Sequence, residues 1–362
     1  MTSGQAPLKF LLLLALLFTL LNAFKPVCID DALYYYHAQQ VSRHPLDPYG
    51  FTVFWNDRPQ PAVENLAPVL MQYWWALAIR LFGQHPFWWK LWLFPYALLL
   101  VWSLHSLLRR FADRSEMTLT WMVILSPVFL PSFNLMLDVP VAALILCAIV
   151  VFLRAAERES LALAVAAGLV GGIAAQTKYN GLVAVGVILY HAFLFKRYRQ
   201  ALVAAVVAGT FFLSWEVFIY LSSGRSHFLA QSETYGSVNL LAKYAYLAWP
   251  LVTIMGAVAP FFTLLGLTAL GARKKTIVMA AVAIAAGFIL IAFVPQRFQA
   301  VGQNTQFTIA HVVFSVFGVG CFVSLLLVIR RLTDSGGKLT NIAKSWAEHR
   351  IEWFLAGWWL LE

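Results

Sequence analysis

The sequence predicts an all-α membrane protein whose helices cross the bilayer about ten times. Of its 362 residues, 61% are hydrophobic and 12% are charged, whereas a soluble domain carries about 25% charged residues. Apolar runs of about 17 to 25 residues recur along the chain, and each is long enough to cross a hydrocarbon layer of about 30 Å as a helix. A water-soluble core could not bury this much apolar surface, so we expect the membrane to be the solvent.

The expected spans follow from hydropathy and from the placement of lysine and arginine. They cover residues 8–24, 87–108, 117–134, 137–153, 161–176, 180–195, 201–221, 247–271, 277–294 and 308–329. The first could instead be a signal peptide, but Leu21-Asn22-Ala23-Phe24 lacks a small-x-small cleavage pattern, which favours an uncleaved span. We expect one transmembrane module over 1–331. Residues 332–362 are expected to be a cytoplasmic or interfacial tail, because the apolar run 353–361 is too short to span.

Basic clusters between the spans predict the orientation of the chain. They contain Arg109, Arg110, Arg114, Arg154, Arg158, Lys196, Arg197, Arg199, Arg273, Lys274, Lys275, Arg330 and Arg331. The positive-inside rule places these clusters in the cytoplasm and the alternate connections outside. We therefore expect a multi-pass protein of the plasma (inner) membrane whose strongest polar features face the outside or periplasm.

The segment from Leu66 to Phe82 is apolar enough to span, but the charge pattern argues against a crossing. If it crossed, Arg109 and Arg110 would lie outside and every later basic connection would be inverted. We expect a helix on the outer surface instead, where Trp74 and Trp75 suit the interface. The first outer loop then runs over about residues 25–86.

Several function classes are disfavoured by composition and motifs. The net charge of +10 comes from short basic clusters that act as orientation signals, so we expect no nucleic-acid partner. Cys28, Cys147 and Cys321 lie far apart without CxxC spacing, which favours neither disulfides nor a thiolate metal site. The sequence also contains no Gly-rich phosphate loop, HExxH or Walker sequence.

Asp30 and Asp31 directly follow the first span and precede an aromatic cluster. Carboxylates at a membrane boundary are costly unless they are hydrated or partnered, so the pair suggests a function. The alternative is structural, because an aspartate can cap the helix that begins near Ala32. One acid could cap the helix while the other faces a cavity.

Four more charged residues fall on the expected outer face. Asp138 begins a span, where capping is the alternative to function, and Glu64 opens the surface helix after a proline-rich loop that holds Arg58. Lys178, between two apolar spans, breaks the positive-inside pattern. It either snorkels to lipid head groups or contacts a phosphate. Such a set can do transfer chemistry, since a carboxylate accepts a proton from an attacking hydroxyl and a lysine stabilises a departing phosphate.

At these residues the chain resembles the GT-C superfamily of glycosyltransferases, and within it family 39, which includes protein O-mannosyltransferases and lipid A aminoarabinose transferases. The resemblance covers roughly residues 8 to 220. Each motif is weak alone, but their order and placement together are fairly specific. The matching segments are Asp30-Asp31-Ala32-Leu33-Tyr34-Tyr35, Asp47-Pro48-Tyr49-Gly50-Phe51, Glu64 with Pro68, Leu137-Asp138 and Thr177-Lys178-Tyr179-Asn180-Gly181.

The resemblance implies a GT-C-type transmembrane helix bundle with surface helices in the first outer loop. It also implies inverting transfer of a sugar from a polyprenyl-phosphate donor to a hydroxyl of an acceptor lipid, glycan or protein at the outer face. Asp30 matches the general base, Asp31 stands where the family often has Glu, and Asp138 matches the second acidic position. Whether a divalent metal joins the acids is left open.

The resemblance also implies substrate contacts, and one of them departs from the family pattern. Glu64 matches the acid of a Glu-Lys-Pro-Pro stretch, but Asn65 and Leu66 replace the lysine and the first proline. That phosphate contact is therefore missing or moved, with Lys178 and Arg58 as candidates. Tyr35 and Tyr179, which lie in two matching segments, are further candidate substrate contacts.

Two other classes compete with the transferase. A polytopic transporter or lipid flippase would also place charges among spanning helices, but transporters usually carry inverted repeats and broken helices at the midplane. No such repeat is visible in the sequence, and the acids gather at one surface. A non-catalytic scaffold that keeps the fold is the third hypothesis.

Overall fold

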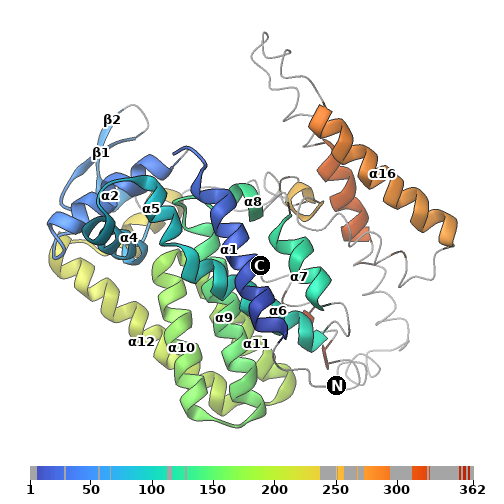
Figure 1. The fold of residues 1–362 in the computed structure, drawn as a ribbon. Coiled ribbons are helices and arrows are strands. Elements are labelled where there is room, and N and C mark those ends of the chain that lie inside the picture. Colours follow the sequence, from blue (N-terminus) through green and yellow to red (C-terminus); the bar gives the residue numbers. More distant parts are fainter. Residues whose placement is uncertain are drawn as a thin grey trace. The chain divides into compact units, whose positions relative to one another are not determined.

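The computed structural model divides the chain into two compact units, drawn in Figure 1. One unit comprises Met1–Ile124, Leu130–Ser237 and Arg350–Glu362, and the other comprises Leu125–Phe129 and Val238–His349. The described residues are 6–27, 30–55, 58–65, 67–111, 116–126, 129–236, 250, 252–256, 267, 273–293, 312–323, 326, 350–351, 354–355 and 358.

A bundle of apolar helices forms the body of the first unit. Its members are α1 (Ala6–Ala23), α6 (Phe94–Phe111), α9 (Asp138–Glu157), α10 (Leu161–Thr177), α11 (Val183–Phe195) and α12 (Tyr198–Ser223). Helix α9 is central, since it packs against α6, α10 and α11. Three helical segments are long and apolar enough to cross a membrane, namely Pro86–Phe111, Asp138–Glu157 and Tyr198–Ser223. Shorter apolar helices cover Leu8–Ala23, Leu161–Thr177, Tyr179–Phe195 and Val312–Val323.

Small residues let α10 and α12 approach closely. A Cβ atom at Gly168 would lie 2.4 Å from the backbone oxygen of Ala204, so any larger residue would push the two helices apart. Alanines continue this packing into a core with Phe152 and Ile188. Close backbone approach through small residues is how helices pack in lipid, where the hydrophobic effect gives no drive to associate.

The segment expected to be the first outer loop folds into a layer over one end of the bundle, here called the outer layer (Figure 1). It contains α2 (Asp31–Arg43), a hairpin of β1 (Thr52–Trp55) and β2 (Arg58–Pro61), α3 (Ala62–Asn65), α4 (Leu70–Phe82) and α5 (Pro86–Leu91). Helix α4 has 13 residues and packs on α2. A helix is thus present near Leu66–Phe82 as expected, and its position at the membrane surface stays a prediction. Val41, Tyr49, Val63 and Ile219 share one core, which fastens this layer to α12.

Local structure differs from the hydropathy prediction at three places. The hairpin β1–β2 lies where only a loop was expected, with Thr52 opposite Pro61 and Trp55 opposite Arg58. The expected span 87–108 agrees with the segment Pro86–Phe111, which is long and apolar enough to cross a membrane, but a turn at Trp92 and Leu93 divides it into α5 and α6. The expected span 117–134 is divided between α7 (Glu116–Ile124) and α8 (Phe129–Ser132). The second division has a clear cause, because Ser126 precedes Pro127 and helices end before prolines.

In the second unit, α16 (Lys274–Phe293) matches the expected span 277–294. A further helix covers 312–323. It lies close to the segment 252–256, since Thr253 and Ser315 hydroxyl oxygens are 2.7 Å apart. The expected spans 247–271 and 308–329 lie only partly within the described residues. The expected boundary between a module ending at 331 and a tail stays a prediction.

Candidate functional site

Asp30 is the N-cap residue of α2, and it caps the helix with its backbone carbonyl rather than with its carboxylate. Its carbonyl accepts hydrogen bonds from the amides of Leu33 and Tyr34 at 3.0 and 3.1 Å. Its side chain makes no capping bond to the helix within the described part of the chain. Asp30 instead lines a hollow of about 500 Å³ whose other walls include Tyr36, Phe51 and Phe54. Side-chain capping therefore does not explain this carboxylate.

Asp31, the next residue, is fully buried. One of its carboxylate oxygens lies 4.0 Å from Nζ of Lys90, and the two side chains are 0% and 2% exposed. The Lys90 ammonium also donates to the carbonyls of Lys25 and Pro26 at 2.8 and 3.1 Å. A buried charge needs such partners to remain ionised. The pair joins the start of α2 to α5 and to the end of α1.

Asp138 and Lys178 form a second, very different pair. Lys178 Nζ lies 2.6 Å from Oδ1 of Asp138, and their side chains are 40% and 45% exposed. Asp138 is the first residue of α9, and Lys178 directly follows α10. Because α9 and α10 are antiparallel neighbours, their opposite ends meet at the same end of the bundle. Both charges stay accessible to a ligand.

The hydroxyl of Tyr34 is influenced electrostatically by three of the acids. Burial raises the pKa of its hydroxyl above the usual value, and the negative charges of Asp30, Asp138 and Asp31 raise that pKa further. Carboxylates at the start of α2 and at the start of α9 therefore both act electrostatically on this hydroxyl. That these acids form one site stays a prediction.

A tight turn carries Lys178. The residues after it, Tyr179–Leu182, form the 3₁₀ turn η1, and the amide of Gly181 donates to the Lys178 carbonyl at 2.8 Å. A Cβ atom at Gly181 would lie 2.3 Å from the carbonyl of Ala174. Only glycine allows this turn to fold back onto the end of α10. The turn thereby fixes the backbone position of Lys178.

Glu216 is a polar anchor that the sequence analysis missed. It lies in α12, is 7% exposed, and accepts hydrogen bonds from Gln176, Tyr179, Ser226 and the amide of Phe228 at 2.9–3.3 Å. An ionisable residue inside an apolar span is itself a signal of function, so the sequence did contain the clue.

Tyr179, a candidate substrate contact, is engaged by this anchor. Its hydroxyl donates to Glu216 at 2.9 Å and lies 2.6 Å from Nδ1 of His227. Because a hydroxyl has one proton to donate, the tyrosine oxygen must accept from a protonated Nδ1 of His227. The contacts tie the turn that carries Lys178 to α13 (His227–Gly236).

Glu64 pairs with a residue that sequence reasoning did not single out. Its carboxylate accepts a hydrogen bond from Arg225 at 2.9 Å, and its backbone carbonyl accepts one from Gln231 at 3.0 Å. Glu64 and Arg225 line a hollow of about 610 Å³ with Ser226. Arg225 thus supplies a cation beside Glu64, next to Asn65 where the resemblance expected a lysine.

The two remaining candidates occupy the outer layer. Tyr35 stacks on Trp89, with ring centroids 4.5 Å apart, and its hydroxyl donates to the carbonyl of Gln84 at 3.3 Å. Arg58 is exposed on β2. Within the described ranges, no group of three or more His, Cys, Asp or Glu side chains could hold a metal ion.

His37 is a second buried polar group of the outer layer that the sequence analysis did not select. It is fully buried and lies against Tyr49 and Phe51, with ring centroids 5.1 and 5.5 Å away. Burial lowers the pKa of its imidazole to about 3, and the nearby His227 contributes in the same direction. His37 is therefore neutral in the folded protein at physiological pH.

Comparisons with known proteins identify the fold. No protein-family model and no curated protein matches the sequence. ArnT from Cupriavidus metallidurans, solved with bound undecaprenyl phosphate, is 18% identical with a TM-score of 0.54, and the match covers 89% of this chain and 60% of that chain. Its apo form gives 18% identity, a TM-score of 0.52, and coverage of 90% and 60%.

An oligosaccharyltransferase from Archaeoglobus fulgidus is a weaker match, with 15% identity, a TM-score of 0.45, and coverage of 98% of this chain and 56% of that one. ArnT is a member of the GT-C superfamily. This chain spans about three fifths of the length of the ArnT chains that it matches. The comparison with ArnT therefore gives the chain a GT-C-type fold, a polytopic bundle of membrane helices.

Proposed function

We propose that this protein is a membrane glycosyltransferase that moves a sugar from a polyprenyl-phosphate donor to an acceptor hydroxyl. The observation that carries the proposal is the accessible pair of Lys178 and Asp138, 2.6 Å apart, together with the Asp30 carboxylate, which lines a hollow of about 500 Å³. The fold shared with ArnT, which was solved with undecaprenyl phosphate, supports the same class of donor.

In the proposed reaction Asp30 is the general base. Its carboxylate takes the proton of the acceptor hydroxyl while that oxygen attacks the anomeric carbon of the sugar. The bond between this carbon and the phosphate oxygen breaks, and polyprenyl phosphate leaves with the bonding electrons. A single displacement of this kind inverts the configuration at the anomeric carbon.

Lys178 and Asp138 form the phosphate side of the proposed site. The lysine neutralises the charge that grows on the departing phosphate. Asp138 holds the ammonium in place before the donor arrives. Because this pair is about half exposed, a phosphate can share the ammonium without displacing a buried partner. Asp31, paired with Lys90 below the surface, positions the helix that carries Asp30.

Glu64, Arg58, Tyr35 and Tyr179 complete the proposed substrate contacts at the outer layer. Arg225, held by Glu64 at 2.9 Å, and the exposed Arg58 are two further cations for the donor's phosphate. Tyr179 acts through the Glu216 anchor, which fixes the turn next to Lys178.

The proposed location is the plasma (inner) membrane, with this site facing the outside or periplasm and Arg110 facing the cytoplasm. Cysteines introduced at positions 58 and 199, both exposed, test the orientation in intact cells. A membrane-impermeant thiol reagent should label position 58 and leave position 199 unlabelled until the cells are opened. The reverse pattern would contradict the orientation.

The test of activity is release of the carrier lipid. Purified protein is incubated with a panel of undecaprenyl-phosphate-linked sugars and acceptors, with and without a chelator, and released undecaprenyl phosphate is measured. Asp30→Asn keeps the shape of the side chain but removes the base, so turnover should fall by roughly a hundredfold to ten-thousandfold. Donor binding should survive in this variant.

Glu159→Gln is the control, because Glu159 is an exposed carboxylate that follows α9 at the end opposite Asp138. It should turn over at the wild-type rate. Full activity in Asp30→Asn would remove Asp30 from the mechanism. If the protein bound the carrier but released none from any donor, the transporter or flippase alternative would gain support.

A further inference from the structure

A second charged site lies at the far end of the bundle. Helix α9 runs from Asp138 to Glu157, so its 20 residues separate the two sites by about 30 Å. At the Glu157 end, α1, α6 and α9 surround a hollow of about 530 Å³, here called the arginine pocket. Its lining residues are Leu8, Leu11, Trp102, His105, Ser106, Arg109, Arg110, Arg154 and Glu157.

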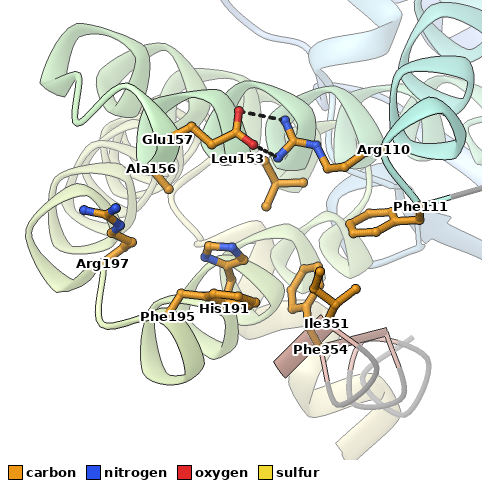
Figure 2. Close-up of a pocket in the computed structure, with 10 residues that line it drawn as sticks. All are labelled: Arg110, Phe111, Leu153, Ala156, Glu157, His191, Phe195, Arg197, Ile351 and Phe354. Atoms are coloured by element: carbon orange, nitrogen blue, oxygen red, sulfur yellow. Dashed lines mark hydrogen bonds and ion pairs between the residues drawn. The ribbon is translucent and has the colours of Figure 1, made fainter. Parts of the chain in front are cut away.

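The arginine pocket carries an excess of positive charge. Arg110 donates two hydrogen bonds to the Glu157 carboxylate at 2.5 and 3.1 Å, as Figure 2 shows, and that pair is neutral. Arg109 and Arg154 have no carboxylate within ion-pair distance among the residues that the structure describes. Arg154 lies over the Trp102 ring at 5.0 Å, a contact that does not neutralise its formal charge. The guanidinium groups of Arg109 and Arg154 could therefore both bind an anion.

The walls of the pocket indicate what kind of anion fits. Leu8 and Leu11 of α1 form one side, and Leu8 is 59% exposed on the outer surface of its helix. The Trp102 ring forms another side. A free phosphate has no apolar part to place against these groups. A lipid offers both an anionic head group and an acyl chain.

We propose that the arginine pocket binds the phosphate head group of an anionic phospholipid through Arg109 and Arg154, with the acyl chain lying along the exposed Leu8. Basic pockets between membrane helices recognise anionic lipid head groups in this way. The site is separate from the acids around Tyr34 and does not depend on the proposed transferase activity.

The experiment titrates the full-length protein in detergent with phosphatidylglycerol or phosphatidylcholine and measures bound lipid by native mass spectrometry. Wild type should prefer phosphatidylglycerol. Arg109→Gln/Arg154→Gln should weaken phosphatidylglycerol binding by roughly 30-fold, since one basic residue near a membrane surface contributes about fivefold. Binding of phosphatidylcholine should be unchanged.

Arg158→Gln/Arg199→Gln is the matched control, because it removes two exposed arginines near the same end of the bundle without touching the pocket. It should keep the wild-type affinity. Ser106→Trp keeps every charge but fills the pocket with a ring, and it should also weaken binding. Gel filtration and thermal melting check that each variant is folded.

Three results would overturn the proposal. Equal losses in both double variants would mean a diffuse attraction to the basic surface. Unchanged affinity in Arg109→Gln/Arg154→Gln would mean that lipid binds elsewhere. Competition by millimolar inorganic phosphate as effective as that by phosphatidylglycerol would mean an ion site without a lipid component.

Discussion

Two aspartate–lysine pairs lie in the same part of the protein and differ in almost every physical respect. Asp31 and Lys90 are 4.0 Å apart and almost fully buried. Asp138 and Lys178 are 2.6 Å apart and about half exposed. The closer pair is thus the accessible one. Proximity of opposite charges alone does not tell which pair acts on a substrate.

Burial decides how each pair is used. Moving two charges out of water costs several kcal/mol for each ion, and the loss of one partner leaves the other charge uncompensated. The buried pair can therefore serve as a structural tie but not as a binding group, because a ligand would have to open the protein. An exposed pair contributes at most about 1 kcal/mol to stability, so it can exchange partners with a phosphate at small cost.

The largest expected effect on stability follows from breaking the buried pair. Lys90→Met should lower the free energy of unfolding by about 3–5 kcal/mol, because it strands a buried carboxylate. Thermal melting in detergent measures this loss. The double variant Asp31→Asn/Lys90→Met should recover part of it, since no ionised group is left behind. A Lys90→Met protein that melts like the wild type would show that Asp31 and Lys90 are not a structural tie.

A medium effect is expected from His37, which belongs to the buried polar groups of the outer layer. Its folded pKa of about 3 lies below the unfolded value of about 6.5, so the unfolded chain binds the proton first as the pH falls. The stability that comes from burying neutral His37 is complete above about pH 6.5 and is lost below it. At pH 5 the loss is roughly 2 kcal/mol.

His37→Phe keeps an aromatic ring against Tyr49 and Phe51 and cannot titrate. Its melting temperature should therefore fall less than that of the wild type between pH 7.5 and pH 5. Lys178→Gln, in the exposed pair, is the control. The fall in its melting temperature between pH 7.5 and pH 5 should equal that of the wild type. Parallel melting curves for wild type and His37→Phe would contradict the burial of a neutral imidazole.

The smallest effect should come from the exposed pair itself. A double-mutant cycle of Asp138→Asn and Lys178→Gln should give a coupling energy of roughly 0.2–1 kcal/mol in thermal stability. A coupling energy as large as that of the buried pair would contradict the claim that the exposed pair contributes little to stability. A small coupling energy would support that claim.

Hydropathy was sufficient for much of the fold, because the length of an apolar run is set by the bilayer. Asp138–Glu157, Leu161–Thr177 and Lys274–Phe293 agree with their expected spans within a few residues. The surface position predicted for α4 rests on the charge of Arg109 and Arg110 on a later connection, and it stays a prediction. Hydropathy could not predict the hairpin at Thr52–Pro61, because the pairing of its two strands depends on packing in the outer layer.

The candidate site was only partly predictable. Asp138 and Lys178 could be expected near each other, since both fall at the same ends of neighbouring spans. The sequence could not predict that Asp31 is buried while Asp30 is partly exposed. The burial of Asp31 depends on its pairing with Lys90, which is distant in sequence. Glu216 was readable as an acid inside an apolar run, whereas its four donors come from three separate segments and appear only in the folded chain.

The central claim is that the exposed pair, and not the buried one, contacts the donor's phosphate. Binding of undecaprenyl phosphate to purified wild type, Lys178→Gln, Lys178→Arg and Asp30→Asn tests it most directly. Lys178→Gln should bind about tenfold or more weakly, from the loss of one charge-assisted contact. Lys178→Arg should retain part of the affinity, and Asp30→Asn should bind like the wild type. Equal affinity in wild type and Lys178→Gln would contradict the account and return Lys178 to a lysine that only snorkels toward lipid head groups.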